Sequence, residues 1–64
     1  MNAARRAALN ITLDSISRRT GRAWQNSERD QATAALNTMA DFPLSQAGYV
    51  AHQLAGQVVK AVRS

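Results

Sequence analysis

The larger apolar residues in the first third of this 64-residue chain recur at helical spacing. Leu9, Leu13 and Ile16 follow the i, i+4, i+7 pattern, which predicts a helix over about residues 3–19. Gly21 is suited to the left-handed conformation found just after the end of many helices. A second, weaker stripe lies on the opposite side of this helix: Ala4, Ala7, Ala8, Ile11 and Ser15. A helix that is apolar on two sides is expected to be central in the fold or shared between two chains.

A second helix is predicted over about residues 27–40. Ser27 is the expected N-cap, and Glu28 and Asp30 place acids in the first turn. Pro43 disfavours helical geometry at Phe42, so the helix must end before that point. The expected buried face consists of Ala32, Ala35, Leu36 and Met39.

The third helix, over about residues 45–63 with Ser45 as its cap, has the clearest pattern. Its larger apolar residues repeat at i+4: Val50, Leu54, Val58 and Val62. Beside them runs a row of small residues, Ala47, Ala51 and Ala55, that would let another helix approach closely. That helix could belong to the same chain or to a second copy. The expected packing or dimer seam is Ala47, Ala51, Leu54, Ala55 and Val58.

The segment that links the first two helices contains ISRRTGRA, which resembles the first half of a helix-turn-helix. The apolar anchors of a recognition helix would fall six and nine residues after Gly21, at Ser27 and Asp30. Both residues are polar. The pattern therefore favours a plain link between packed helices, with Trp24 folded over the junction.

Composition limits how such a fold can be stabilised. Alanine supplies 13 of the apolar residues, and only 15 larger apolar side chains remain besides Met1. Without cysteine and with a single histidine, the chain is expected to form neither a disulfide nor a zinc site. Because chains this short bury little surface by themselves, we expect one all-α domain over residues 1–64 that is completed by homodimerisation.

The sequence contains no arrangement typical of catalysis. It has four acids, one histidine (His52) and three scattered glycines, with no nucleophile–base pair and no phosphate-binding loop. We therefore expect no enzyme activity, cofactor, metal or small-molecule substrate. The absence of an apolar span or a signal-peptide pattern, together with the lack of cysteine, favours a cytoplasmic protein.

The distribution of charge gives the strongest functional signal. The net charge is +4, and residues 1–22 carry all of this excess. Arginine, which is suited to phosphate and carboxylate, supplies seven of the eight cations. The expected function is a small basic regulator that binds DNA or RNA, and the alternative is an adaptor or inhibitor on an acidic protein surface, like small phage- or plasmid-type accessory proteins. The expected contact residues are Arg5, Arg6, Arg18, Arg19 and Arg22.

Overall fold

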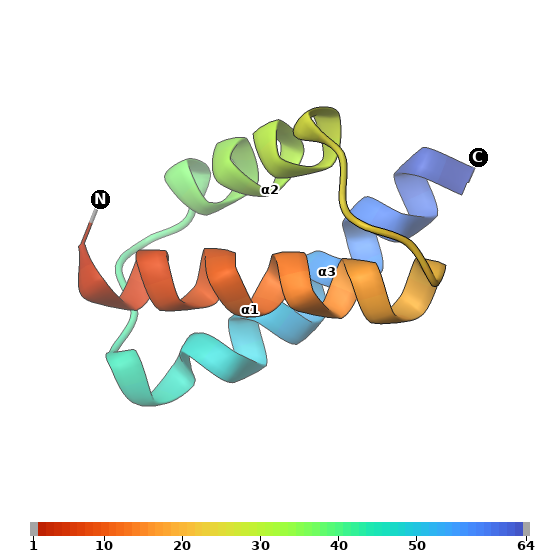
Figure 1. Ribbon diagram of the computed structural model, residues 1–64. Helices are drawn as coiled ribbons and strands as arrows, with labels where there is room; N and C mark the ends of the chain where they lie inside the picture. Colours follow the sequence, from red (N-terminus) through yellow and green to blue (C-terminus); the bar gives the residue numbers. More distant parts are fainter. Residues whose placement is uncertain (1, 64) are drawn as a thin grey trace.

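Three α-helices and one short 3-10 helix form the regular structure of residues 2–63, the part of the chain that the computed structural model describes. They are α1 (Ala3–Thr20), α2 (Asn26–Thr38), η1 (Leu44–Gln46) and α3 (Ala47–Arg63). In Figure 1, α1 and α3 run in the same general direction, and α2 returns in the opposite one. The described residues contain no strand, so the predicted all-α architecture with three helices is confirmed.

Local capping sets both ends of α1. The Asn2 side chain accepts a hydrogen bond from the backbone N–H of Arg5 at 2.9 Å. Gly21 adopts a left-handed conformation with φ of 70°, and its N–H donates to the carbonyl of Ser17. Such a residue satisfies a carbonyl that the helix itself leaves unpaired. The predicted end of this helix therefore agrees with the structure to within one residue.

The predicted start of α2 agrees with the structure to within one residue, but the predicted N-cap is wrong. Gln25 is the N-cap, so Ser27 lies within the first turn, and Glu28 occupies the third helical position. There Glu28 accepts a hydrogen bond from the backbone N–H of Gln25 at 2.7 Å, which is half of a capping box. The helix also ends at Thr38, two residues before the predicted end.

The entry into α3 also differs from the prediction. Ser45 lies inside η1 and caps nothing with its side chain, because the chain already turns at Pro43. The N–H of Gln46 donates to the carbonyl of Pro43 at 2.9 Å, and α3 continues directly from Ala47.

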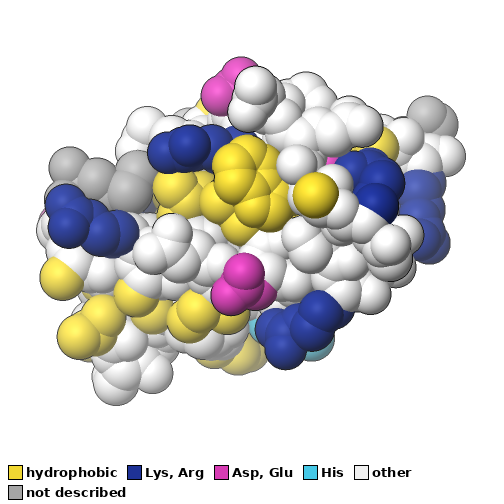
Figure 2. Space-filling model, viewed as in Figure 1, with side chains coloured by type: hydrophobic (Ala, Val, Ile, Leu, Met, Phe, Trp, Pro, Cys, Tyr) yellow, Lys and Arg dark blue, Asp and Glu magenta, His cyan; other side chains and the backbone are white. Residues whose placement is uncertain are grey.

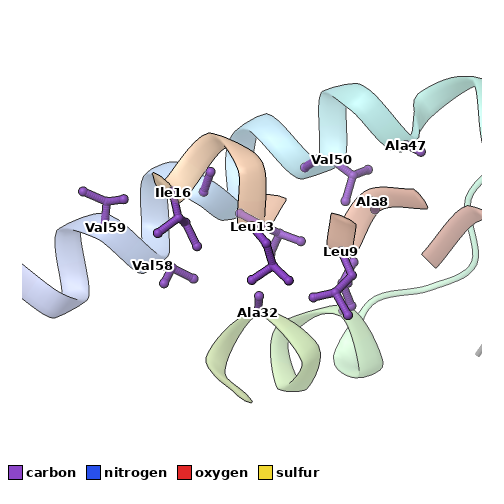
Figure 3. Close-up of a cluster of buried hydrophobic side chains, with 13 residues drawn as sticks. Ala8, Leu9, Leu13, Ile16, Ala32, Ala47, Val50, Val58 and Val59 are labelled. Atoms are coloured by element: carbon purple, nitrogen blue, oxygen red, sulfur yellow. The ribbon is translucent and has the colours of Figure 1, made fainter. Parts of the chain in front are cut away.

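The core lies mainly between α1 and α3, with α2 closing one side (Figure 3). Ala51 and Ala55 are fully buried, and the Thr12 hydroxyl of α1 lies 3.4 Å from the carbonyl oxygen of Ala51. The row of small side chains on α3 thus packs against α1 of the same chain. All five residues of the predicted seam are buried within the single chain: Ala47, Ala51, Leu54, Ala55 and Val58.

Some side chains expected in the core are exposed. Met39 is 38% exposed because α2 ends before it, and Val62 is 40% exposed in the last turn of α3. Ile11, from the second stripe of α1, is 38% exposed, and buried Thr12 lies on that side of the helix instead. Val59 is buried because it continues the i+4 row of Ala47, Ala51 and Ala55.

Candidate nucleic-acid interface

Arg5 is part of the packing between distant segments. Its side chain is 12% exposed, and Nη2 donates to Oδ1 of Asp41 at 3.2 Å and to the carbonyl of Met39. The guanidinium also lies 5.7 Å from the centre of the Phe42 ring, within the range of a cation–π interaction. Arg5 therefore ties the start of α1 to the segment between α2 and α3, which leaves it poorly placed to bind a partner.

Arg22 is engaged as well. Its Nη1 donates to Oε1 of Glu28 at 2.9 Å, and its Nη2 donates to Oε2 at 3.4 Å. Glu28 is fully buried, and the hydrogen bond from Arg22 is the main cause that lowers the pKa of this carboxyl. A buried carboxylate without its cation would be costly. Arg22 thus neutralises the charge of Glu28 at the start of α2, although part of the Arg22 side chain remains exposed.

The fold joins two of the remaining arginines to cations from the other end of the chain. Arg18 and Arg19 are exposed in the last turn of α1, and Lys60 and Arg63 are exposed at the end of α3. Nη2 of Arg63 donates to the carbonyl of Arg19 at 3.3 Å, so the two helix ends lie together. We call Arg18, Arg19, Lys60 and Arg63 the basic end.

Sequence reasoning missed Lys60 and Arg63 as functional candidates. Both look like ordinary complements of the negative end of a helix dipole. The available signal was the similar placement of cations in the last turns of two helices. From the sequence alone it could not be inferred that these two turns lie close together, because this depends on α1 and α3 running in the same direction (Figure 1).

No carboxylate of residues 2–63 forms an ion pair with the basic end, although Asp14 lies one turn before Arg18 on α1. The two ion pairs found in residues 2–63 are Arg5–Asp41 and Arg22–Glu28, so neither involves a residue of the basic end. Half of the four acids are thus used to neutralise arginines that belong to the packing. The cations left unpaired include the four that gather where α1 and α3 end.

The face formed by α1 and α2 has a different character. Figure 2 shows separate basic side chains around a hydrophobic patch there, not one continuous basic surface. Trp24 is half-buried against the core as expected, and the guanidinium of Arg29 lies 5.9 Å from its ring. Arg6 is exposed on a neighbouring groove between the two helices that Asp30 also lines. This face is therefore a less suitable phosphate surface than the basic end.

Arg19 reaches across from α1 to the surface of α3. Its Nη2 lies 3.0 Å from Nδ1 of His52. A guanidinium can only donate, so His52 accepts at Nδ1. A Cβ atom at Gly56 would lie 3.2 Å from Nη1 of Arg19, so the glycine provides room for this crossing. Glycine within a helix costs about 1 kcal/mol relative to alanine, and here the missing side chain makes space for a cation.

The comparisons with known proteins assign no family. No protein-family model, curated protein or solved structure matches this chain. Among residues 2–63, no three histidine, aspartate or glutamate side chains gather as metal ligands would. No helix in that part of the chain is long and apolar enough to cross a membrane.

Proposed function

We propose that this protein is a small, non-enzymatic nucleic-acid-binding regulator whose interface is the basic end. The observation that carries the proposal is that Arg19 lies beside Arg63 and shares a groove with Lys60, with Arg18 in the same last turn of α1. None of these four cations forms an ion pair with a carboxylate of residues 2–63. A concentrated group of exposed cations is the electrostatic requirement for holding a phosphate backbone.

Complementation of the helix dipoles explains only part of this arrangement. Each helix end attracts nearby cations by roughly 0.3–1 kcal/mol, which favours a basic residue in the last turn. It does not account for the crossing of Arg19 to His52, which takes this cation away from the carbonyls of its own helix end. A role in binding an external anion accounts for both features.

The interface is suited to the backbone and not to particular bases. Sequence is read by side chains that reach base edges, usually from a helix lying in the major groove. Here the cations project from the ends of two helices, and α2 begins with a buried carboxylate where a recognition helix would need apolar anchors. We therefore expect weak sequence preference and strong dependence on salt.

The test is a salt titration with two matched double variants. Each phosphate contact contributes about 0.9 to the log–log salt slope on duplex DNA, so Arg18→Gln with Arg63→Gln should lower the slope by about two units. The control is Arg6→Gln with Arg29→Gln, which removes the same charge from exposed positions on α1 and α2. At a rise of 1.5 Å per residue, Arg6 lies about 18 Å along α1 from Arg18.

Binding of DNA and RNA would be measured by fluorescence anisotropy, with circular dichroism to verify folding. An unchanged slope in the control and a reduced one in the first variant support the proposed interface. Equal reductions in both would show that only net charge matters. No binding by the wild type at about 50 mM salt, where non-specific binders are strongest, would exclude the function.

An acidic protein surface is the competing partner, because guanidinium groups also pair with carboxylates. Affinity capture from native lysate, with and without nuclease, separates the two. Retention of a protein after nuclease treatment would favour the adaptor or inhibitor function, whereas loss of all bound material would favour nucleic acid.

Homodimerisation requires a surface other than the small-residue row of α3, which α1 covers. We propose the groove between α2 and α3. Its lining contains no charged residue: Ala35, Thr38, Met39, Tyr49, Val50, Gln53, Leu54 and Gln57. Two copies of a chain with a net charge of +4 repel least where the contact is uncharged. Tyr49, 70% exposed beside it, is a residue type enriched at interfaces.

A further inference from the structure

A shallow groove on the surface of α3 brings Arg19 of α1 together with polar side chains of α3. Its lining residues are Arg19, His52, Gln53, Gly56, Gln57 and Lys60, and we call it the cationic groove. It contains two permanent cations and no carboxylate. With a volume of about 270 Å³, it lies below the roughly 300–1,000 Å³ typical of small-molecule pockets. This size and charge suit one compact anionic group.

We propose that the cationic groove binds a single phosphate group, and that in the proposed nucleic-acid complex this is one backbone phosphate. The inference rests on the proposed function, since it names the ligand chemistry of one part of the same interface. Arg19 and Lys60 supply the positive charge, and the amides of Gln53 and Gln57 supply neutral donors.

His52 has a defined part in this site. Because its Nδ1 accepts from Arg19, the N–H donor of the neutral ring is Nε2. The contact also holds the guanidinium over α3, beside Gly56, where a Cβ would lie 3.2 Å from Nη1. An arginine fixed in this way loses less freedom when it binds an anion, and preorganisation of this kind favours binding.

The site would be tested by NMR titration of the full chain with inorganic phosphate, at constant ionic strength with chloride as the reference anion. The same titration would be repeated with a short oligodeoxynucleotide. The reporters are the amide of Gly56 and the ring of His52. Phosphate should shift both reporters beyond the effect of chloride, and the oligonucleotide should shift them as well.

Two variants and one control make the assignment specific. Arg19→Gln should weaken phosphate binding by about tenfold or more, because a hydrogen bond between charged groups is lost. Gly56→Ala should weaken it more modestly, because its Cβ would lie 3.2 Å from Nη1 and shift the end of Arg19 by a few tenths of an ångström, whereas nothing lies within 4 Å of a Cβ at Gly48. Gly48→Ala on the same helix is therefore the matched control, expected to bind like the wild type.

The outcomes separate this inference from the proposed function. If phosphate shifts the reporters but the oligonucleotide does not bind, the groove accepts a free phosphate and the nucleic-acid function is wrong. If the oligonucleotide binds without moving Gly56 or His52, the function stands and the groove is not the phosphate site. An Arg19→Gln variant that binds phosphate as tightly as the wild type also overturns the inference.

Discussion

At the scale of single residues, the arginines of this protein have two different roles. Arg5 and Arg22 complete ion pairs that hold segments of the fold together, and Arg18 and Arg19 remain exposed. The difference does not lie in the residue type. It follows from which arginines the fold holds in ion-pair contact with a carboxylate. Glu28 shows the consequence most clearly, since its buried carboxylate depends on both Arg22 and the N–H of Gln25.

The stability of the protein should therefore fall in acid through Glu28. Arg22 lowers the pKa of Glu28 in the folded state, so the ionised carboxyl stabilises the fold above its unfolded pKa. That contribution is lost as the pH falls below about 4.3 and through the lowered folded pKa. Thermal melts of wild type and Glu28→Gln from pH 7 to pH 3 measure this.

Glu28→Gln should be less stable at neutral pH and should lose less stability on acidification. Asp30→Asn is the matched control, because Asp30 is an exposed acid in the same helix. It should keep the wild-type pH profile. Parallel profiles for wild type and Glu28→Gln would show that the buried pair does not control acid stability.

At the scale of the helices, close approach of α1 and α3 is the main packing feature. It depends on small side chains on α3 and on the Thr12 hydroxyl, which donates to the Ala8 carbonyl within α1 at 2.6 Å. This internal bond satisfies a buried polar group at the helix contact. The helices can then meet without an unpaired hydroxyl between them.

Ala51→Leu should disrupt this contact. Ala51 is completely buried, and forcing extra methylenes into a packed core typically costs about 1–3 kcal/mol. Urea denaturation should show this loss, whereas Ala34→Leu at an exposed position of α2 should change stability by about 0.5 kcal/mol or less. Wild-type stability in Ala51→Leu would mean that the α1–α3 contact is looser than the structure indicates.

At the scale of the whole molecule, the uncharged groove proposed for dimerisation adjoins the cationic groove, because Gln53 and Gln57 line both. The cations gather where α1 and α3 end, and the groove between α2 and α3 is uncharged. A dimer formed there would still leave the cations of the basic end outside the contact, since none of them lines the uncharged groove. A dimer presenting two basic ends would also bind nucleic acid more tightly than one copy.

The dimer prediction can be tested with a charged substitution. Light scattering at about 100 μM should give a dimer mass for the wild type. Tyr49→Glu should shift it to the monomer, because a charge in an otherwise uncharged contact must lose its hydration. Ile11→Glu, at an exposed apolar position of α1, should remain dimeric. A monomer mass for the wild type would contradict the prediction.

The sequence by itself determined the features that depend on neighbouring residues. Helix α1 could be predicted closely because its apolar spacing and Gly21 act within a few turns. The all-α class and the row of small residues on α3 follow from the same short-range periodicity. The sequence also showed the excess positive charge of residues 1–22, but not which of these arginines form ion pairs and which remain exposed.

Only the tertiary structure decided which cations remain available. Arg5 meets Asp41 across 36 positions of the chain, and Arg63 reaches Arg19 across 44. Arg22 and Glu28 are closer in sequence, and their ion pair lies at the start of α2, where Gln25 and not Ser27 is the N-cap. The pattern of single residues does not specify the relative direction of α1 and α3, because that direction results from the joint packing of side chains from all three helices. This packing brings Arg63 to the carbonyl of Arg19 and Lys60 into a groove that Arg19 also lines, and thereby creates the candidate site.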